Sequence, residues 1–203
     1  MSRRLAFYFD YASPYAYLGA MRVEALARRH RADLRWRPFL LGALFQAIGT
    51  PLVPIEAMAA PKREHQRRDL MRWAEHHGLP LVWNRRFPLD TRTALRITLL
   101  VDDARRGPLV RAFFRAAWAE DLDLEEPSVL RACLERAAMP PELLERARGP
   151  EAKGVLRAAT AEAIERGVPG APSFLVEDRF LFWGQDRMDF VGRALDGWEP
   201  TAG

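Results

Sequence analysis

The residues best suited to chemistry in this sequence lie at the start of a predicted helix. Ser13 precedes Pro14, and apolar residues then recur at mostly helical spacing to about His30, so Ser13 is the predicted N-cap and Pro14 the first helical residue. Free backbone N–H groups and the positive end of the helix dipole favour an anion there, and a thiolate would be stabilised. A serine here is also explained as an ordinary cap, so Ser13 alone leaves both roles open.

A second feature is a proline at the start of a predicted strand. Residues 167–174 read GVPGAPSF and place Pro172 between a glycine-rich loop and a strand, where a central strand normally excludes proline. A cis peptide bond between Ala171 and Pro172 would explain this position. We therefore predict a cis bond in this loop.

The cysteine and histidine content excludes several kinds of site. Cys133 is the one cysteine, so the chain has no internal disulfide, CxxC redox pair or cysteine-rich zinc site. Cys133 lies beside leucines on an apolar helical face and is expected in the core. The four histidines show no HExxH pattern or paired spacing with carboxylates, so no metal is expected.

Composition and charge argue against nucleic-acid and membrane partners. Of the 31 basic residues 29 are arginine, scattered among 27 acidic residues, so the net charge of +4 does not predict nucleic-acid binding. No apolar run approaches the ~18 residues that a membrane span needs. The chain begins like a signal peptide until Asp10 interrupts its apolar stretch, so we expect no export and a cytoplasmic protein.

The elements that position Ser13 and Pro172 lie at the two ends of the chain. Apolar or alternating runs predict strands over residues 5–9, 33–38, 173–176 and 179–183, with the last two forming a hairpin and a terminal helix beginning near Met188. Residues 61–167 are predicted to be helical, with stripes that belong to the core. The predicted order is β-α-β, a helical insertion, then β-β-α.

Glycine and proline divide the helical block. Predicted helices begin at Pro61, at a cap formed by Asp90 or Thr91, and near residues 109, 128, 140 and 151; the first stops at Gly78 and the second near Gly107 and Pro108. Residues 79–83 are a candidate strand within the block. The segment after the second strand, with Phe45 and Thr50, is predicted to be a loop.

Three segments in the correct order resemble one known family. Residues 7–18 (FYFDYASPYAYL), 167–174 and 182–187 (FWGQDR) are similar to signatures of the glutathione-dependent branch of the DsbA-like thioredoxin superfamily, which holds kappa-class glutathione transferases and 2-hydroxychromene-2-carboxylate isomerases. The resemblance spans nearly the whole chain. It implies an α/β fold with a thioredoxin-like β-α-β…β-β-α domain, residues 1–40 and 168–203, and a large all-α insertion, residues 41–167, that includes the connecting loop.

The resemblance also implies a glutathione site. Ser13 would donate a hydrogen bond to the sulfur of glutathione and stabilise its thiolate, and the backbone of Ala171 would pair with the cysteinyl part. Gln185 and Asp186 would bind the γ-glutamyl end, with the Asp186 carboxylate facing its ammonium group. The other implied glutathione-binding residues are Pro172, Trp183 and Gly184.

Three further positions are implied to contact the substrate. Phe45 and Thr50 lie in the segment that in relatives closes over glutathione and substrate, and Lys62 occupies a place where the family often has a lysine. His65 stands where relatives often have an aromatic residue, and Asp90-Thr91 replaces an expected Asn-Ser or Asn-Thr step. Both departures leave the substrate's identity open, and His65 is expected to be a solvated helix residue.

The resemblance implies an enzyme that uses glutathione to isomerise an aromatic pyruvate derivative. The reaction would interconvert 2-hydroxychromene-2-carboxylate and trans-o-hydroxybenzylidenepyruvate in aromatic catabolism, and the protein would be a homodimer. A kappa-like transferase or peroxidase would use the same residues, and a non-catalytic thioredoxin-fold binding protein is the alternative of another class. A disulfide oxidoreductase is excluded because residues 13–16 contain no thiol.

Overall fold

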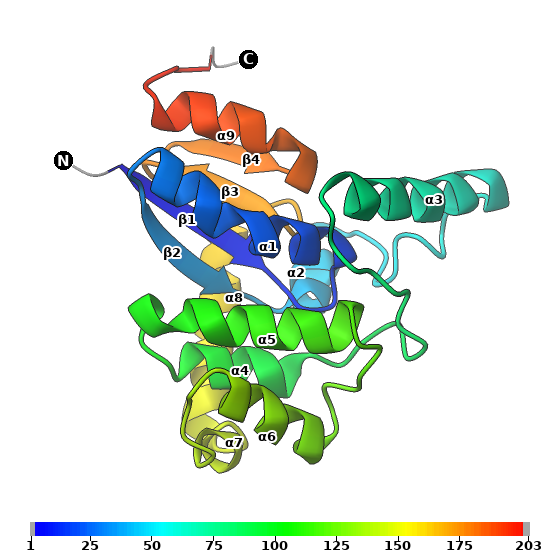
Figure 1. Cartoon of the computed structure of the whole chain (residues 1–203), viewed down its shortest axis with the longest axis vertical. Helices are drawn as coiled ribbons and strands as arrows, with labels where there is room; N and C mark the ends of the chain where they lie inside the picture. Colours follow the sequence, from blue (N-terminus) through cyan, green and yellow to red (C-terminus); the bar gives the residue numbers. More distant parts are fainter. Residues whose placement is uncertain (1–2, 201–203) are drawn as a thin grey trace.

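A four-stranded mixed sheet in the order β2-β1-β3-β4 forms the centre of the structure, a computed structural model that describes residues 3–200 (Figure 1). β1 (Arg4–Phe9) pairs in parallel with β2 (Asp33–Pro38). On its other side it pairs antiparallel with β3 (Ser173–Val176), which pairs antiparallel with β4 (Phe180–Trp183). Because β1 is a central strand, the loop that carries Ser13 leaves from the middle of the sheet.

Helices cover the sheet and continue beyond it. Their bounds are α1 (Pro14–Arg29), α2 (Leu41–Ile48), α3 (Ala60–His76), α4 (Arg92–Leu99), α5 (Arg106–Trp118), α6 (Pro127–Arg136), α7 (Leu143–Arg146), α8 (Pro150–Glu165) and α9 (Met188–Leu195), with 3-10 turns at Asp103–Arg105 and Gln185–Arg187. In Figure 1, α1 lies in front of β1, α9 lies beside β4, α3 projects to the right, and α4 to α7 form the lower part of the molecule.

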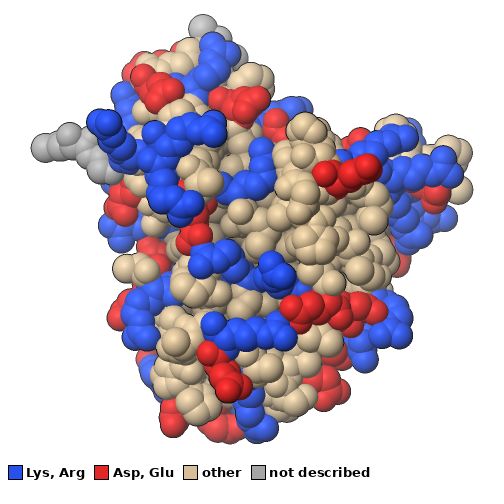
Figure 2. Space-filling view, in the orientation of Figure 1, with Lys and Arg blue, Asp and Glu red and all other residues tan. Residues whose placement is uncertain are grey.

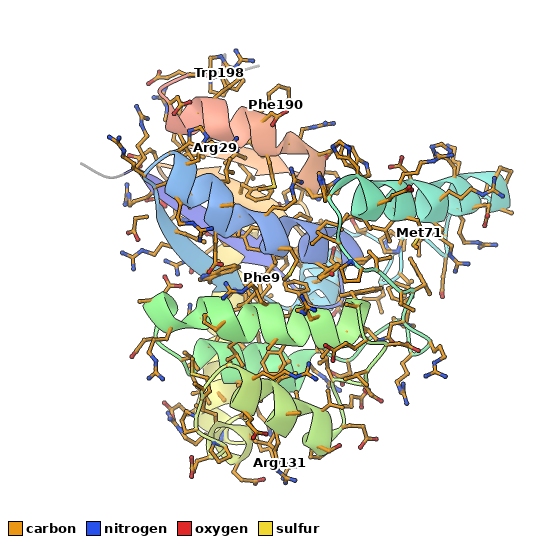
Figure 3. All side chains as sticks on the ribbon, viewed as in Figure 1. Phe9, Arg29, Met71, Arg131, Phe190 and Trp198 are labelled. Atoms are coloured by element: carbon orange, nitrogen blue, oxygen red, sulfur yellow. The ribbon has the colours of Figure 1, made fainter. Side chains whose placement is uncertain are left out.

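The alternation of side chains along β1 builds two cores on opposite faces of the sheet. Phe7 and Phe9 belong to the larger core, which includes residues of α1, α5 and α9. Figure 3 shows Phe9 in the interior between α1 and α5. Tyr8 belongs to the other core with Leu44 of α2 and Ala163 of α8. The carboxyl end of β1 is therefore held from both sides.

The helical region shares the larger core. The ring of Phe114 on α5 lies 5.6 Å from that of Phe9 and 4.8 Å from that of Tyr11, and Trp118 Nε1 donates to the Tyr11 carbonyl at 2.7 Å. These contacts cross the predicted domain boundary at residues 40–41. The division into 1–40 with 168–203 and 41–167 stays a prediction, and its residues 1–2 and 201–203 lie outside the described part of the chain.

Most sequence-predicted elements are confirmed. β2, β3 and α9 begin at the predicted residues, and β1 and β4 differ by one residue at their starts. Ser13 is the N-cap of α1 with Pro14 as its first residue, and the Ala171–Pro172 bond is cis. Cys133 is 1% exposed and lies in the core.

Three predictions about the helical region are wrong. The segment after β2 contains α2 rather than only a loop, so Phe45 is a helical residue. Gly107 and Pro108 do not end a helix; they lie in the first turn of α5, where free N–H groups make proline acceptable, and α4 ends at Leu99. Residues 79–83 form no strand and connect α3 to the segment before α4.

The surface and the helices show three further features. Figure 2 shows basic side chains interspersed with acidic ones and an uncharged area right of the centre on this face. Among residues 3–200, none of the helices combines the length and apolar character that crossing a membrane requires. Within the same residues, no three His, Cys, Asp or Glu side chains are grouped so that they could hold a metal ion.

Candidate functional site

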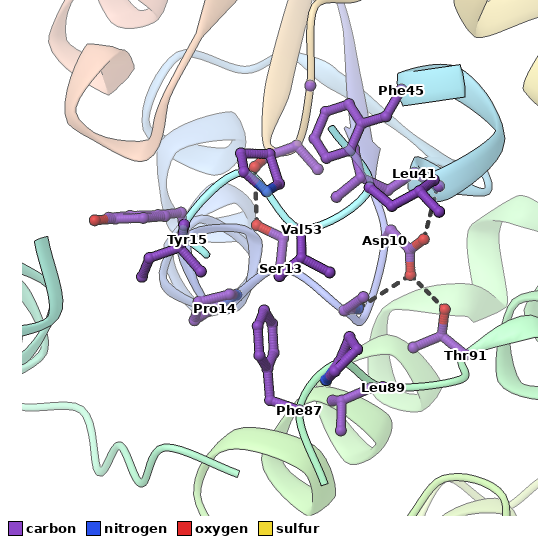
Figure 4. A pocket seen from close by; sticks show the side chains of 18 of the residues that line it. Asp10, Ser13, Pro14, Tyr15, Leu41, Phe45, Val53, Phe87, Leu89 and Thr91 are labelled. Atoms are coloured by element: carbon purple, nitrogen blue, oxygen red, sulfur yellow. Dashed lines mark hydrogen bonds between the residues drawn. The ribbon is translucent and has the colours of Figure 1, made fainter. Parts of the chain in front are cut away.

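Ser13 lies on the wall of a cavity of about 670 Å³. Four segments supply most of its lining: the start of α1, α2 with the residues after it, the loop before β3, and the stretch that leads into α4 (Figure 4). Gln66 and Leu70 of α3, Trp183 at the end of β4, and Glu125 complete it. Tyr15, Phe45, Val53, Trp83, Phe87 and Leu89 contribute much of its apolar lining. A buried hydroxyl at the end of a central strand therefore faces a space large enough for a small organic molecule.

The hydroxyl of Ser13 makes two hydrogen bonds. Its Oγ accepts from the backbone N–H of Ala16 at 3.1 Å, which is the expected N-cap bond, and donates to the carbonyl of Ala171 at 2.8 Å. Ser13 is only 6% exposed. The position of Oγ, beside the free N–H groups at the start of α1, favours negative charge next to it.

The cis-proline loop lies directly against this serine. Ala171 lines the cavity, and the buried Pro172 behind it accepts a hydrogen bond through its carbonyl from the N–H of Gly184 at 3.0 Å. Trp183, 58% exposed, covers Gly170, where an added Cβ would lie 2.9 Å from the indole Nε1. The structure thus brings Ser13, Ala171, Pro172, Trp183 and Gly184 together.

The last two predicted glutathione residues lie outside the cavity lining. Gln185 is buried at 2% exposure, and Arg22 Nη1 on α1 donates to its side-chain oxygen at 3.0 Å. Asp186 is partly exposed and pairs with Arg187 at 2.8 Å. Gly184 has φ +111°, and a Cβ there would lie 2.5 Å from Asp186 Oδ1, so only glycine lets this carboxylate fold back over the turn.

The predicted substrate residues separate into two groups. Phe45 on α2 and Thr50 just beyond it both line the cavity, and the Thr50 N–H donates to the Phe45 carbonyl at 2.9 Å. Lys62 is exposed near the start of α3 and does not line the cavity. His65 is exposed on the same helix, as expected of a solvated residue.

One wall of the cavity was not anticipated. Phe87, Pro88 and Leu89 lead into α4 and line the cavity opposite α2, and the Phe87–Pro88 bond is cis. Trp83 stands beside them, with its ring 4.9 Å from that of Phe87. An aromatic residue followed by proline between two predicted helices was the available signal, but it gives no indication of which space the ring faces.

A buried carboxylate at the end of β1 was also missed. Asp10 is 1% exposed; it accepts hydrogen bonds from the N–H groups of Ala12 at 3.0 Å and Leu41 at 2.8 Å, and from the hydroxyl of Thr91 at 2.6 Å. Burial raises the pKa of Asp10, and these hydrogen bonds oppose that effect. A charged residue immediately after an apolar strand was the signal for it.

The rim of the cavity carries an ion pair. Asp90 binds Arg92 through both carboxylate oxygens, each 2.9 Å from Nε, and the bond holds the pKa of Asp90 below its usual range. Arg92 is the one Lys, Arg or His residue among the described residues that line this cavity. The sequence left the role of Asp90 open; in the structure its carboxylate is paired with Arg92.

Residues 4–196 match the sequence profile of the DSBA-like thioredoxin domain. The chain belongs to this DSBA-like thioredoxin family. A 2-hydroxychromene-2-carboxylate isomerase of Sphingobium xenophagum is 31% identical to this family member over 192 residues, 94% of this chain and 97% of the relative. A solved structure of a protein of that name matches with a TM-score of 0.85 at 26% identity, covering 95% of this chain and 94% of the other.

The DSBA-like chain is also related to kappa-class transferases. Human (Homo sapiens) glutathione S-transferase kappa 1 is 24% identical, over 96% of this chain and 92% of its own length. These matches confirm the predicted family and its thioredoxin-like fold with a helical insertion. They extend over both the sheet and the helical region, so the whole cavity lies in the matched part of the chain.

Proposed function

We propose that this DSBA-like protein is a glutathione-dependent isomerase that interconverts 2-hydroxychromene-2-carboxylate and trans-o-hydroxybenzylidenepyruvate. The observation that carries the proposal is the place of Ser13: its hydroxyl lies at the start of α1, bound to the Ala171 carbonyl, and on the wall of the cavity. The 31% identity to a named isomerase over nearly the whole chain supports this choice of reaction.

The residues beside Ser13 fit glutathione. Ala171 presents a carbonyl that already accepts a hydrogen bond, and a cysteinyl N–H paired with it in strand-like fashion would replace the Ser13 proton there. Ser13 Oγ–H would then be free to donate to sulfur while Oγ keeps the Ala16 bond. Bound glutathione supplies a thiolate nucleophile that adds reversibly to a conjugated acceptor. Gln185 and Asp186, on the turn after Gly184, are proposed to bind its γ-glutamyl end.

The remaining cavity fits a flat aromatic acceptor. Phe45 and Phe87 line opposite walls, and apolar surface predominates between them, which excludes water from the reacting atoms. Thr50 offers a hydroxyl, and Arg92, although paired with Asp90, is the cationic side chain of the described lining that an acceptor's carboxylate could approach. Lys62 remains a proposed substrate contact, although in this structure it lies on the exposed side of α3.

A kappa-like transferase or peroxidase is the second candidate function. The relationship to glutathione S-transferase kappa 1 favours it, and the same Ser13 and Ala171 would serve. Product analysis separates the two, because an isomerase returns free glutathione whereas a transferase leaves it attached to the acceptor. A non-catalytic binding protein of this fold would bind no glutathione. The homodimeric state and the cytoplasmic location remain proposals, and light scattering of the purified protein tests the first.

The deciding experiment is a calorimetric titration with glutathione, combined with the ultraviolet absorbance of the thiolate against pH. Saturable binding with a lowered thiol pKa supports the proposal and leads to a turnover assay with 2-hydroxychromene-2-carboxylate. No binding at millimolar glutathione would contradict both glutathione-dependent functions. The binding-protein alternative would then be the better account.

A further inference from the structure

Three helices begin at one buried carboxylate. Asp10 Oδ1 accepts from the N–H of Ala12, which precedes the N-cap residue of α1, and from the hydroxyl of Thr91, the N-cap residue of α4. Asp10 Oδ2 accepts from the N–H of Leu41, the first residue of α2. Figure 4 shows these bonds at the edge of the cavity. Segments far apart in sequence are therefore joined at a single side chain.

Neither α2 nor α4 is capped by the side chain of its own N-cap residue. The N-cap of α2 is Leu40, which has no polar side chain, and the Thr91 hydroxyl is turned toward Asp10 instead of its own helix. The first N–H groups of a helix need acceptors, and negative charge is favoured at the positive end of its dipole. Asp10, the residue after β1, thus supplies the anionic acceptor that Leu40 cannot.

The segments that Asp10 joins carry the two opposite walls of the cavity. Phe45 is one helical turn after Leu41, and Phe87 to Leu89 precede Thr91 with one residue, Asp90, between them. α2 is short, and Leu44 is its one buried residue, although the Leu40 N–H also donates to Thr160 at 3.0 Å. Leu44, with the partly buried Leu41 and Phe45, packs α2 into the core that contains Ala163 of α8, and Asp10 supplies a polar attachment at the first residue of the helix.

We propose that Asp10 is a positioning residue that sets the distance of both acceptor-binding walls from Ser13. This inference rests on the proposed function for its kinetic part only. Asp10 borders the cavity but is only 1% exposed, and its two oxygens already accept from three donors, so the proposal gives it no direct bond to glutathione or acceptor. It acts by holding the walls that carry Phe45 and Phe87, so its loss affects acceptor binding more than glutathione binding.

Two variants test the attachment of the two walls separately. In Asp10→Asn, the negative charge beside the start of α2 is lost, and the amide NH2 group replaces one of the two oxygens. The N–H of either Leu41 or Ala12 then has no acceptor on this side chain, whereas the Thr91 hydroxyl can turn to accept from the NH2 group. Thr91→Val keeps the shape of the side chain, removes only the hydroxyl, and leaves the Leu41 bond. Asp103→Asn is the matched control, because Asp103 also accepts a backbone N–H, that of Trp36 at 2.9 Å, but lies outside the cavity lining.

The measurements are amide hydrogen exchange, KM for 2-hydroxychromene-2-carboxylate and the dissociation constant of glutathione. For Asp10→Asn we expect exchange of residues 44–48 to accelerate about tenfold and the acceptor KM to rise about tenfold, with less than a threefold change in glutathione affinity. For Thr91→Val we expect a several-fold rise in KM with unchanged exchange in α2. Asp103→Asn should alter neither quantity.

Three results would overturn the inference. The first is a folded Asp10→Asn protein with wild-type exchange in α2 and an acceptor KM within twofold. The second is an equal rise in KM and in exchange for Asp103→Asn, which would show a general loss of stability. The third is an equal weakening of glutathione and acceptor binding, which would place the effect at Ser13. Hydrogen exchange is measured without glutathione, so it tests the role of Asp10 independently of the proposed function. A wild-type protein that binds no glutathione would contradict the proposed function, and the exchange result would still show whether Asp10 holds α2.

Discussion

Replacement of Ser13 by alanine tests the central chemical assignment. The substitution removes one hydroxyl, together with its bond from the Ala16 N–H and its bond to the Ala171 carbonyl. The cap bond contributes to stability, and the proton on Oγ is the group proposed to stabilise a thiolate. The two effects have different sizes and are measured separately.

The magnitudes follow from the contacts. Loss of an N-cap hydroxyl costs about 1 kcal/mol, which lowers Tm by about 3 °C in a chain of this size. A hydrogen bond to a charged group is worth about 1.5–3 kcal/mol, so the pKa of bound glutathione's thiol should rise by about 1–2 units. If the same stabilisation operates in the transition state, kcat falls about 10- to 150-fold. Turnover should therefore fall much more than stability.

Ser173→Ala provides the matched control. Ser173 is fully buried two residues after Ala171, and its Oγ donates to the Gly170 carbonyl at 2.7 Å, but it does not line the cavity. Its loss should lower Tm by a similar amount and leave turnover near the wild-type value. The assays are thermal unfolding, ultraviolet titration of the bound thiol, and turnover of 2-hydroxychromene-2-carboxylate.

A Ser13→Ala protein that keeps kcat within about threefold of wild type, with an unchanged thiol pKa, would refute the reasoning. Equal losses of turnover in Ser13→Ala and Ser173→Ala would do the same, because they would trace the effect to the loop and not to the hydroxyl. A changed thiol pKa in Ser13→Ala alone is the result that the geometry of Oγ requires.

Three other predictions concern separate parts of the chain. Gly184→Ala should weaken glutathione binding about tenfold in calorimetry, because the added Cβ would displace the Asp186 carboxylate. Gly78→Ala is the control: Gly78 also has a positive φ but open space around it, so this substitution should lower only the stability of the protein. Phe87→Ala should raise the acceptor KM about tenfold in steady-state kinetics without changing glutathione affinity, since it removes part of one cavity wall; an unchanged KM would place the acceptor elsewhere. Burial raises the pKa of Cys133 to about 11, so about one molecule in a thousand carries a thiolate at pH 8. A thiol reagent should therefore label Cys133 only after the protein is unfolded or at strongly alkaline pH. Rapid labelling of the folded protein at pH 8 would contradict this prediction.

Local rules account for what the sequence alone determined. The apolar run of residues 5–9, the alternation in residues 33–38 and the Ser13-Pro14 pair depend on neighbours in the chain, so β1, β2 and the start of α1 were predictable. Pro172 indicated a cis bond for the same reason. The three signature segments indicated the family, and the profile match over residues 4–196 confirms it.

Contacts between distant segments decided the rest. α2 has no polar N-cap residue of its own, so nothing local marks its start; its first N–H is satisfied by Asp10, 31 residues earlier. The burial of Gln185 could not be predicted either, because its side-chain oxygen accepts a hydrogen bond from Arg22 of α1, far away in the sequence. Which space Phe87 lines depends on the packing of the segment before α4 against α5, where its ring lies 6.3 Å from that of Trp118. The sequence by itself therefore determined the reactive end of the site, because a cap and a cis proline are local, and only the tertiary structure decided the walls, because their hydrogen bonds and apolar contacts join residues that no short-range pattern links.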